Sequence, residues 1–124
     1  MSDTFTSKLA AAVSAAALGI LAVGFKPASA QGFDCRKAEF ATERTICRNA
    51  KLGALDEQMS SLYGELKATT AGKRQRAELK TYQRQFLDAR DSCGRDADCI
   101  RGAYLDQIGV LDERLERASR RSER

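Results

Sequence analysis

The chain has 124 residues, with 21 Lys and Arg against 17 Asp and Glu, so its net charge is +4. This length fits one small domain, and the complete lack of histidine excludes catalytic and zinc sites that need an imidazole. Four cysteines in so short a chain instead favour a disulfide-stabilised domain.

Residues 1–30 have the three parts of a secretory signal peptide. Lys8 gives a positive start, residues 9–25 form an uncharged apolar run, and small residues precede the predicted cleavage between Ala30 and Gln31. The alternative is an uncleaved membrane anchor, for which this Ala-rich run is at the short limit. We therefore expect a periplasmic or secreted protein that has no membrane span after cleavage.

The four cysteines form two pairs that are close in sequence: Cys35 with Cys47, and Cys93 with Cys99. Local pairing closes two short loops, each of which stabilises by roughly 2–3 kcal/mol on the chain-entropy model. The two long-range pairings remain open. Zinc sites need closer ligand pairs or histidine, and a redox site needs Cys-x-x-Cys, so neither a metal nor thiol chemistry is expected.

The mature chain begins with a short irregular segment, after which Thr42 is the predicted N-cap of a short helix over residues 43–48. Asn49 is placed to end this helix and to cap the next one. Residues 51–68 are predicted to be helical because apolar residues recur at steps of 3 and 4, at Leu52, Leu55, Met59, Leu62 and Leu66.

After a break at residues 69–72, the same steps predict a second helix over residues 73–93, followed by Gly94 as its C-terminal stop. Asp96 is the predicted cap of a third helix, and a basic tail is expected to fray from about residue 117. The apolar stripes of these two helices comprise Leu79, Tyr82, Phe86, Ala89 and Cys93, then Ile100, Tyr104, Ile108, Leu111 and Leu115. Residues 31–124 are thus predicted to form one all-α domain, an antiparallel helical hairpin with a third packed helix, closed by two local disulfides.

No catalytic site or cofactor is predicted, and we expect a protein that is not an enzyme. Neighbouring carboxylates at Asp56 and Glu57 and at Asp112 and Glu113 diverge on a helix and are interpreted as solvated surface. Charges of alternating sign between residues 113 and 117 are likewise interpreted as surface ion pairs.

One basic run stands out at the start of the second long helix. It offers contacts to a cell wall or another anionic surface, whereas nucleic acid is not an expected partner of an exported protein without an aromatic stacking surface. The alternative is an ordinary solvated face. The run comprises Lys73, Arg74, Arg76, Lys80 and Arg84.

Three stretches of the chain resemble the lysozyme inhibitor LprI-like family. They are FDC, ERTIC, LGALD and LY between residues 33 and 63, QRQFLDARDSC at residues 83–93, and CIRGAY at residues 99–104. Phe86 stands where the family usually has tryptophan, which keeps an aromatic core contact and loses an indole donor. The resemblance implies a small exported helical protein of the bacterial envelope with disulfides, and inhibition of lysozyme.

A lysozyme of the c-type is strongly basic, so an inhibitor with a positive net charge needs a local acidic patch. Candidate partner-binding residues cluster around the second cysteine pair: Asp88, Asp91, Asp96 and Asp98. The expected function is therefore non-catalytic binding, with a lysozyme as the first partner. The alternative is a structural or accessory envelope protein that binds peptidoglycan, anionic lipid headgroups or another envelope protein.

Overall fold

The computed structural model describes residues 32–124, and the signal peptide predicted to end between Ala30 and Gln31 lies outside the described residues. A short 3-10 turn, η1 (Cys35–Lys37), precedes four helices: α1 (Ala41–Arg48), α2 (Ala50–Thr69), α3 (Lys73–Ser92) and α4 (Ala97–Ser122). Residues 32–124 contain no strand. The predicted all-α class is confirmed.

The ends of the long helices follow from local capping chemistry. Asn49 accepts hydrogen bonds from two backbone N–H groups in the first turn of α2, and Asp96 does the same for α4. Gly94 follows α3 with φ of 60°, a left-handed conformation that glycine adopts without steric cost. These three predicted boundary residues are confirmed.

Helix α1 begins differently from the prediction, because Thr42 lies inside it rather than capping it. The Glu43 carboxylate accepts hydrogen bonds from the backbone N–H groups of Glu39 at 2.8 Å and Phe40 at 3.2 Å. Thr42 is buried, and its hydroxyl donates to the carbonyl oxygen of Asp91 at 3.2 Å. This threonine therefore joins α1 to the end of α3.

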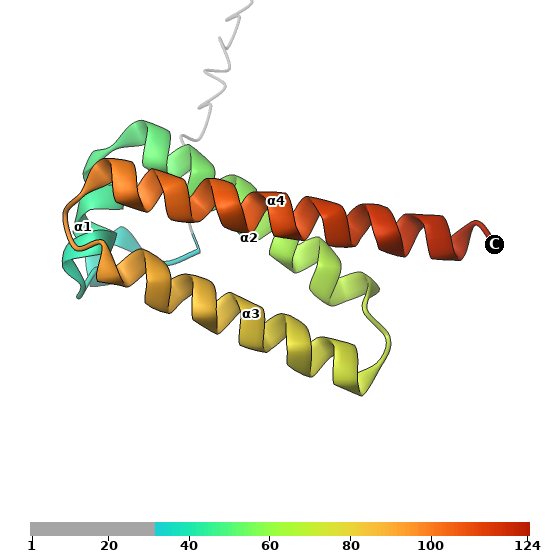
Figure 1. Ribbon diagram of the computed structural model, residues 1–124. Helices are drawn as coiled ribbons and strands as arrows, with labels where there is room; N and C mark the ends of the chain where they lie inside the picture. The colour runs from blue at the N-terminus through green and yellow to red at the C-terminus, as the bar shows by residue number, and fades with distance from the viewer. Residues whose placement is uncertain (1–31) are drawn as a thin grey trace, which may run out of the picture.

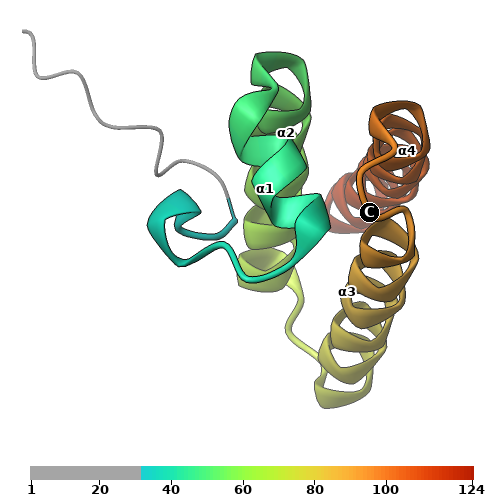
Figure 2. The same ribbon diagram turned by 90° about the vertical axis from the view of Figure 1, so that its left-hand side faces the viewer.

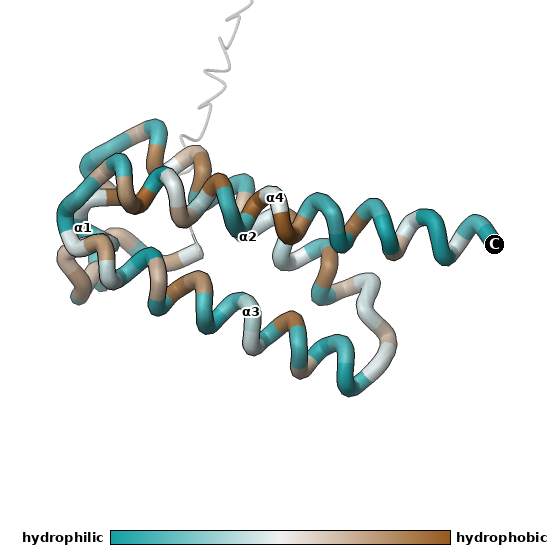
Figure 3. The backbone as a smooth tube through the Cα atoms, viewed as in Figure 1, coloured by the Kyte–Doolittle hydropathy of each residue, from teal (hydrophilic) through white to brown (hydrophobic). Residues whose placement is uncertain are grey.

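The predicted hairpin with a third packed helix is confirmed. Helices α2 and α3 run antiparallel, and α4 packs against both, most extensively against α2 (Figure 1). Helix α1 lies across one end of the bundle, where it contacts all three long helices (Figure 2). Hydrophobic positions recur along each helix, as the tube in Figure 3 shows. The buried core comprises Ile46, Leu52, Met59, Leu66, Leu79, Phe86, Ile100, Tyr104, Ile108 and Leu111.

Both disulfides pair locally, as predicted. Cys35–Cys47 joins η1 to the end of α1 across a Cα–Cα distance of 5.8 Å, and Cys93–Cys99 spans the corner between α3 and α4 at 5.6 Å. All four cysteines are therefore engaged. The two cross-links lie at the same end of the bundle, which we call the disulfide end.

The C-terminal tail differs from the prediction, because α4 continues to Ser122 instead of fraying from about Arg117. An ion pair between Arg117 and Glu113, one helical turn apart, supports this extension. None of the helices formed by residues 32–124 has the length and hydropathy that a membrane span requires.

Candidate functional site

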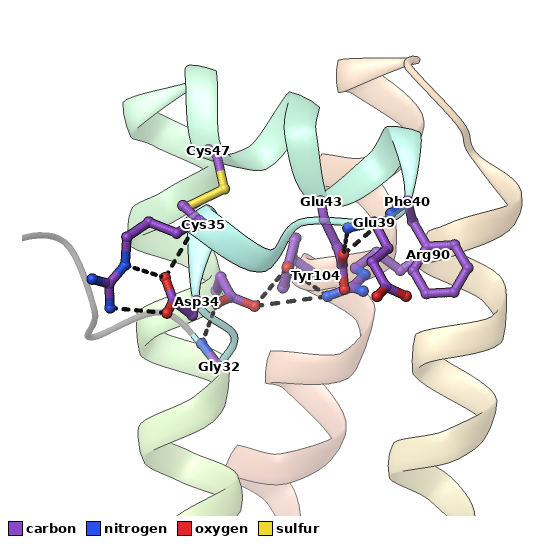
Figure 4. The surroundings of a disulfide bond; sticks show 11 residues. Gly32, Asp34, Cys35, Glu39, Phe40, Glu43, Cys47, Arg90 and Tyr104 are labelled. Atoms are coloured by element: carbon purple, nitrogen blue, oxygen red, sulfur yellow. Dashed lines mark hydrogen bonds and ion pairs between the residues drawn. A yellow bond between two sulfur atoms is a disulfide. The ribbon is translucent and has the colours of Figure 1, made fainter.

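Three polar side chains from three helices meet inside the disulfide end. Asp56 of α2 and Tyr104 of α4 are 0% exposed, and Arg90 of α3 is 3% exposed. The Tyr104 hydroxyl donates to Oδ1 of Asp56 at 2.6 Å, and Nη1 of Arg90 lies 3.4 Å from that hydroxyl and 4.0 Å from the same carboxylate oxygen. Figure 4 shows Tyr104 and Arg90 converging beneath the segment that carries Cys35. We call Asp56, Arg90 and Tyr104 the polar triad.

Two further segments complete the hydrogen bonding of the polar triad. The backbone N–H of Gly32 donates to Oδ2 of Asp56 at 2.5 Å, which attaches the N-terminal segment to α2. The guanidinium of Arg90 donates to Asp91 at 2.7 and 2.8 Å and lies 5.6 Å from the centre of the Phe33 ring. The triad therefore connects the N-terminal segment with α2, α3 and α4.

This arrangement is suited to holding the fold rather than to chemistry on a substrate. Burial works against the charge of Arg90, but Tyr104 and Asp91 raise its pKa above the usual range. A buried polar group that keeps all its partners rigidifies a core, and losing one partner is costly. We therefore assign the polar triad a structural role.

The triad corrects one prediction from the sequence. Asp56 and Glu57 were both interpreted as solvated surface, whereas only Glu57 is exposed and Asp56 is completely buried. The signal was present in the spacing, because Asp56 follows Leu52 by four residues and precedes Met59 by three. A carboxylate in that register lies on the buried face of its helix.

The polar triad predicts a loss of stability at alkaline pH. Burial and the neighbouring Asp56 carboxylate raise the pKa of Tyr104 well above its ordinary value of 10.0. The unfolded chain therefore loses the Tyr104 proton at a lower pH than the folded chain does. The contribution of this buried hydroxyl to the free energy of unfolding is fully present below pH 10, and it falls as pH rises, by up to about 1.4 kcal/mol per pH unit. Denaturant unfolding between pH 8 and 11.5 measures it. A Tyr104→Phe variant with the same alkaline slope as the unsubstituted protein would contradict this assignment.

The four predicted aspartates divide into two kinds. Asp91 binds Arg90, and Asp96 caps α4, so both have roles within the fold. Asp88 and Asp98 are exposed beside the Cys93–Cys99 corner, and Asp98 forms an exposed ion pair with Arg101 at 3.4 Å. Of the four aspartates, Asp88 and Asp98 could therefore bind a partner without giving up a contact that holds a helix end.

An exposed aromatic ring at the same end of the molecule was missed from the sequence. Phe40 is 55% exposed on the segment that leads into α1, beside Glu39 and Glu43 (Figure 4). Apolar periodicity does not identify such a residue, because Phe40 lies before the helix begins.

The predicted basic run is exposed along α3, and two of its arginines have partners within the fold. Arg74 pairs with Glu78 at 3.0 Å, and Arg76 donates to the carbonyl oxygen of Thr70 at 3.2 Å. Arg74 also faces a groove whose other arginines come from α4, at Arg114, Arg117 and Arg121. The prediction from sequence grouped basic residues that are neighbours along α3, whereas the folded protein brings together arginines from α3 and α4.

No three His, Cys, Asp or Glu side chains within residues 32–124 are arranged to hold a metal ion. The described part of the chain is a small all-α protein, closed by two disulfides, whose buried polar groups hold the helices together. A family model described as Lysozyme inhibitor LprI matches residues 35–124, and the chain belongs to this family. No curated protein and no solved structure matches it.

Membership confirms the resemblance seen in the sequence. The family is described as one of lysozyme inhibitors, which agrees with the expected binding function. The family and the two disulfides together point to an exported protein.

Proposed function

We propose that this protein is exported to the periplasm or beyond the cell and inhibits a lysozyme by binding it, without catalysis. The observation that carries the proposal is the family match, which spans residues 35–124. The signal peptide expected over residues 1–30 supports export. A small helical protein that two disulfides hold together at one end is suited to blocking an enzyme sterically.

The disulfide end is the proposed contact surface. The Cys93–Cys99 bridge fixes the corner that carries exposed Asp88 and Asp98, and Phe40 lies exposed at the same end of the bundle. Exposed aromatic residues are frequent anchors of protein interfaces, and carboxylates beside them complement a basic enzyme. Asp91 and Asp96 belong to the same corner and stabilise it from within.

Inhibition is measured by following the clearing of a bacterial cell-wall suspension by lysozyme as the purified protein is added. Phe40→Ala is expected to raise the half-inhibitory concentration by about tenfold, because truncating an interface anchor costs more than 1 kcal/mol. Asp88→Asn with Asp98→Asn is expected to raise it by roughly two- to tenfold, mainly through slower association at low salt.

A matched control places the same two charge changes elsewhere. Asp106 and Asp112 are exposed on α4, and replacing both with asparagine is expected to leave inhibition unchanged. No inhibition at large molar excess would remove that lysozyme as the partner. Equal weakening by the test and control pairs would remove the proposed contact surface while leaving inhibition itself in place.

A further inference from the structure

A groove with a volume of about 730 Å³ opens at the end of the bundle opposite the disulfides. It lies between the end of α2, the start of α3 and the last turns of α4, where α3 and α4 diverge in Figure 1. Leu66 and Leu79 give it apolar lining, and four arginines line it from two helices: Arg74, Arg114, Arg117 and Arg121. We call it the arginine groove.

Basic groups outnumber acidic groups around the arginine groove. Glu78 is the acidic residue that lines it, and it pairs with Arg74 at 3.0 Å. Arg117 pairs with Glu113, whereas the Arg121 side chain is exposed near the end of α4. Convergent cations in a concave site raise the local concentration of anions.

Arg114 is held in place at the wall of the arginine groove. Its guanidinium stacks on the ring of Tyr82 at 4.0 Å from the centroid. Tyr82, which the apolar stripe placed in the core, is 42% exposed. The Nε of Arg114 is buried and has no hydrogen-bond partner among the described residues. The stacking on Tyr82 thus holds the guanidinium beside the groove, and arginine side chains bind phosphate in a bidentate manner.

The backbone around the arginine groove carries partial charges of both signs. Helix α3 begins there, with Gly72 as an N-cap that has no side chain, and this helix end favours an anion. Helices α2 and α4 end at the same groove, and the last carbonyl groups of a helix carry partial negative charge. The positive potential of the groove therefore comes from its arginines rather than from the helix ends.

We propose that the arginine groove binds the phosphate of an anionic lipid headgroup. Its four arginines complement the charge of a lipid phosphate. Leu66 and Leu79 line the groove but are only 5% and 3% exposed, so the groove would take the headgroup rather than the acyl chains. A second copy in the same orientation would bring its own arginines against these, so self-association through this groove is disfavoured. Its distance from the disulfide end leaves the proposed lysozyme surface accessible.

The test is cosedimentation of the exported, purified protein with vesicles at low salt. Phosphatidylcholine vesicles containing phosphatidylglycerol are compared with pure phosphatidylcholine. Arg117→Gln with Arg121→Gln is expected to lower the partition constant for the anionic vesicles by about 20-fold. Lys51→Gln with Arg95→Gln removes the same charge from exposed positions at the disulfide end and is expected to lower it less than about threefold.

A second variant keeps every arginine. Ala118→Glu places a carboxylate in the groove on a helix that tolerates glutamate, and it is expected to weaken vesicle binding as strongly as the arginine pair. Circular dichroism verifies that each variant is folded.

Three results would overturn the proposal. Equal weakening by the groove and control pairs would mean unspecific charge attraction, and no binding to anionic vesicles would exclude a lipid. Binding of polyglutamate but not vesicles, lost in the groove variants, would assign the groove to an acidic protein segment. Each result leaves the lysozyme assay unaffected, so the two proposals fail independently.

Discussion

Replacing Asp56 with alanine is expected to lower the free energy of unfolding by about 3–5 kcal/mol. The substitution removes the acceptor of the Tyr104 hydroxyl and of the Gly32 N–H, and it leaves Arg90 buried with only Asp91 as a carboxylate partner. A buried cation that loses one of two acidic neighbours retains its desolvation cost without the compensating attraction. Urea denaturation followed by circular dichroism measures the change.

The neighbouring residue provides a matched control for this prediction. Glu57→Ala removes a carboxylate from the next position of the same helix, where it is exposed, and is expected to change stability by less than about 0.5 kcal/mol. Tyr104→Phe, which removes one hydrogen bond, is expected to cost about 1–3 kcal/mol. Similar losses for Asp56→Ala and Glu57→Ala would show that Asp56 is not held as described.

The helices were predictable because their apolar spacing is a local property. Steps of 3 and 4 residues place one side of each long helix toward the core, and the stripes of α2 and α4 are buried almost as predicted. Asn49, Asp96 and Gly94 act within a few residues of their own position, so their roles follow from residue type.

The polar triad was not predictable from the same reasoning. A search for apolar residues passes over Asp56 and Arg90, although both occupy the register of the core face. Their partners are distant in sequence, since Asp56 and Tyr104 are 48 residues apart. Only the packing of α4 against α2 and α3 reveals that these polar groups satisfy one another.

The arginine groove was missed for a related reason. Arg114 and Arg117 resemble ordinary surface charges when α4 is considered alone, and Arg117 does form an i,i+4 ion pair. They line a groove with Arg74 only because the chain reverses at residues 70–72 and again at residues 93–96. Grouping by sequence neighbourhood cannot identify a site that two chain reversals assemble.

Removing the Cys35–Cys47 bridge by replacing both cysteines with serine is expected to lower the free energy of unfolding by about 3 kcal/mol. The two cysteines of this bridge are 12 residues apart in sequence, whereas Cys93 and Cys99 are 6 apart. Because a shorter loop constrains the unfolded chain less, removing the Cys93–Cys99 bridge is expected to cost slightly less. Reversible denaturation of the two double variants under identical conditions ranks them. A larger loss from the Cys93–Cys99 pair would contradict the ranking.

The Cys35–Cys47 bridge should also be energetically coupled to the polar triad. It anchors the segment in which Gly32 donates to Asp56, at a position where a β-carbon would lie only 2.7 Å from the Ser60 hydroxyl oxygen. Without the bridge, this close approach is maintained by the hydrogen bond and by the contacts of Phe33 with Arg90 and the core. The cost of Asp56→Asn should then be smaller, because part of the contact has already been lost.

A double-mutant cycle measures this coupling. Asp56→Asn and the Cys35–Cys47 serine pair are expected to be non-additive by about 0.5–3 kcal/mol, whereas Asp56→Asn and the Cys93–Cys99 serine pair should be more nearly additive. The second cycle is the control, since that bridge holds the α3–α4 corner and not the segment containing Gly32. Additivity in both cycles would show that the first bridge stabilises the chain without positioning Gly32 on the triad.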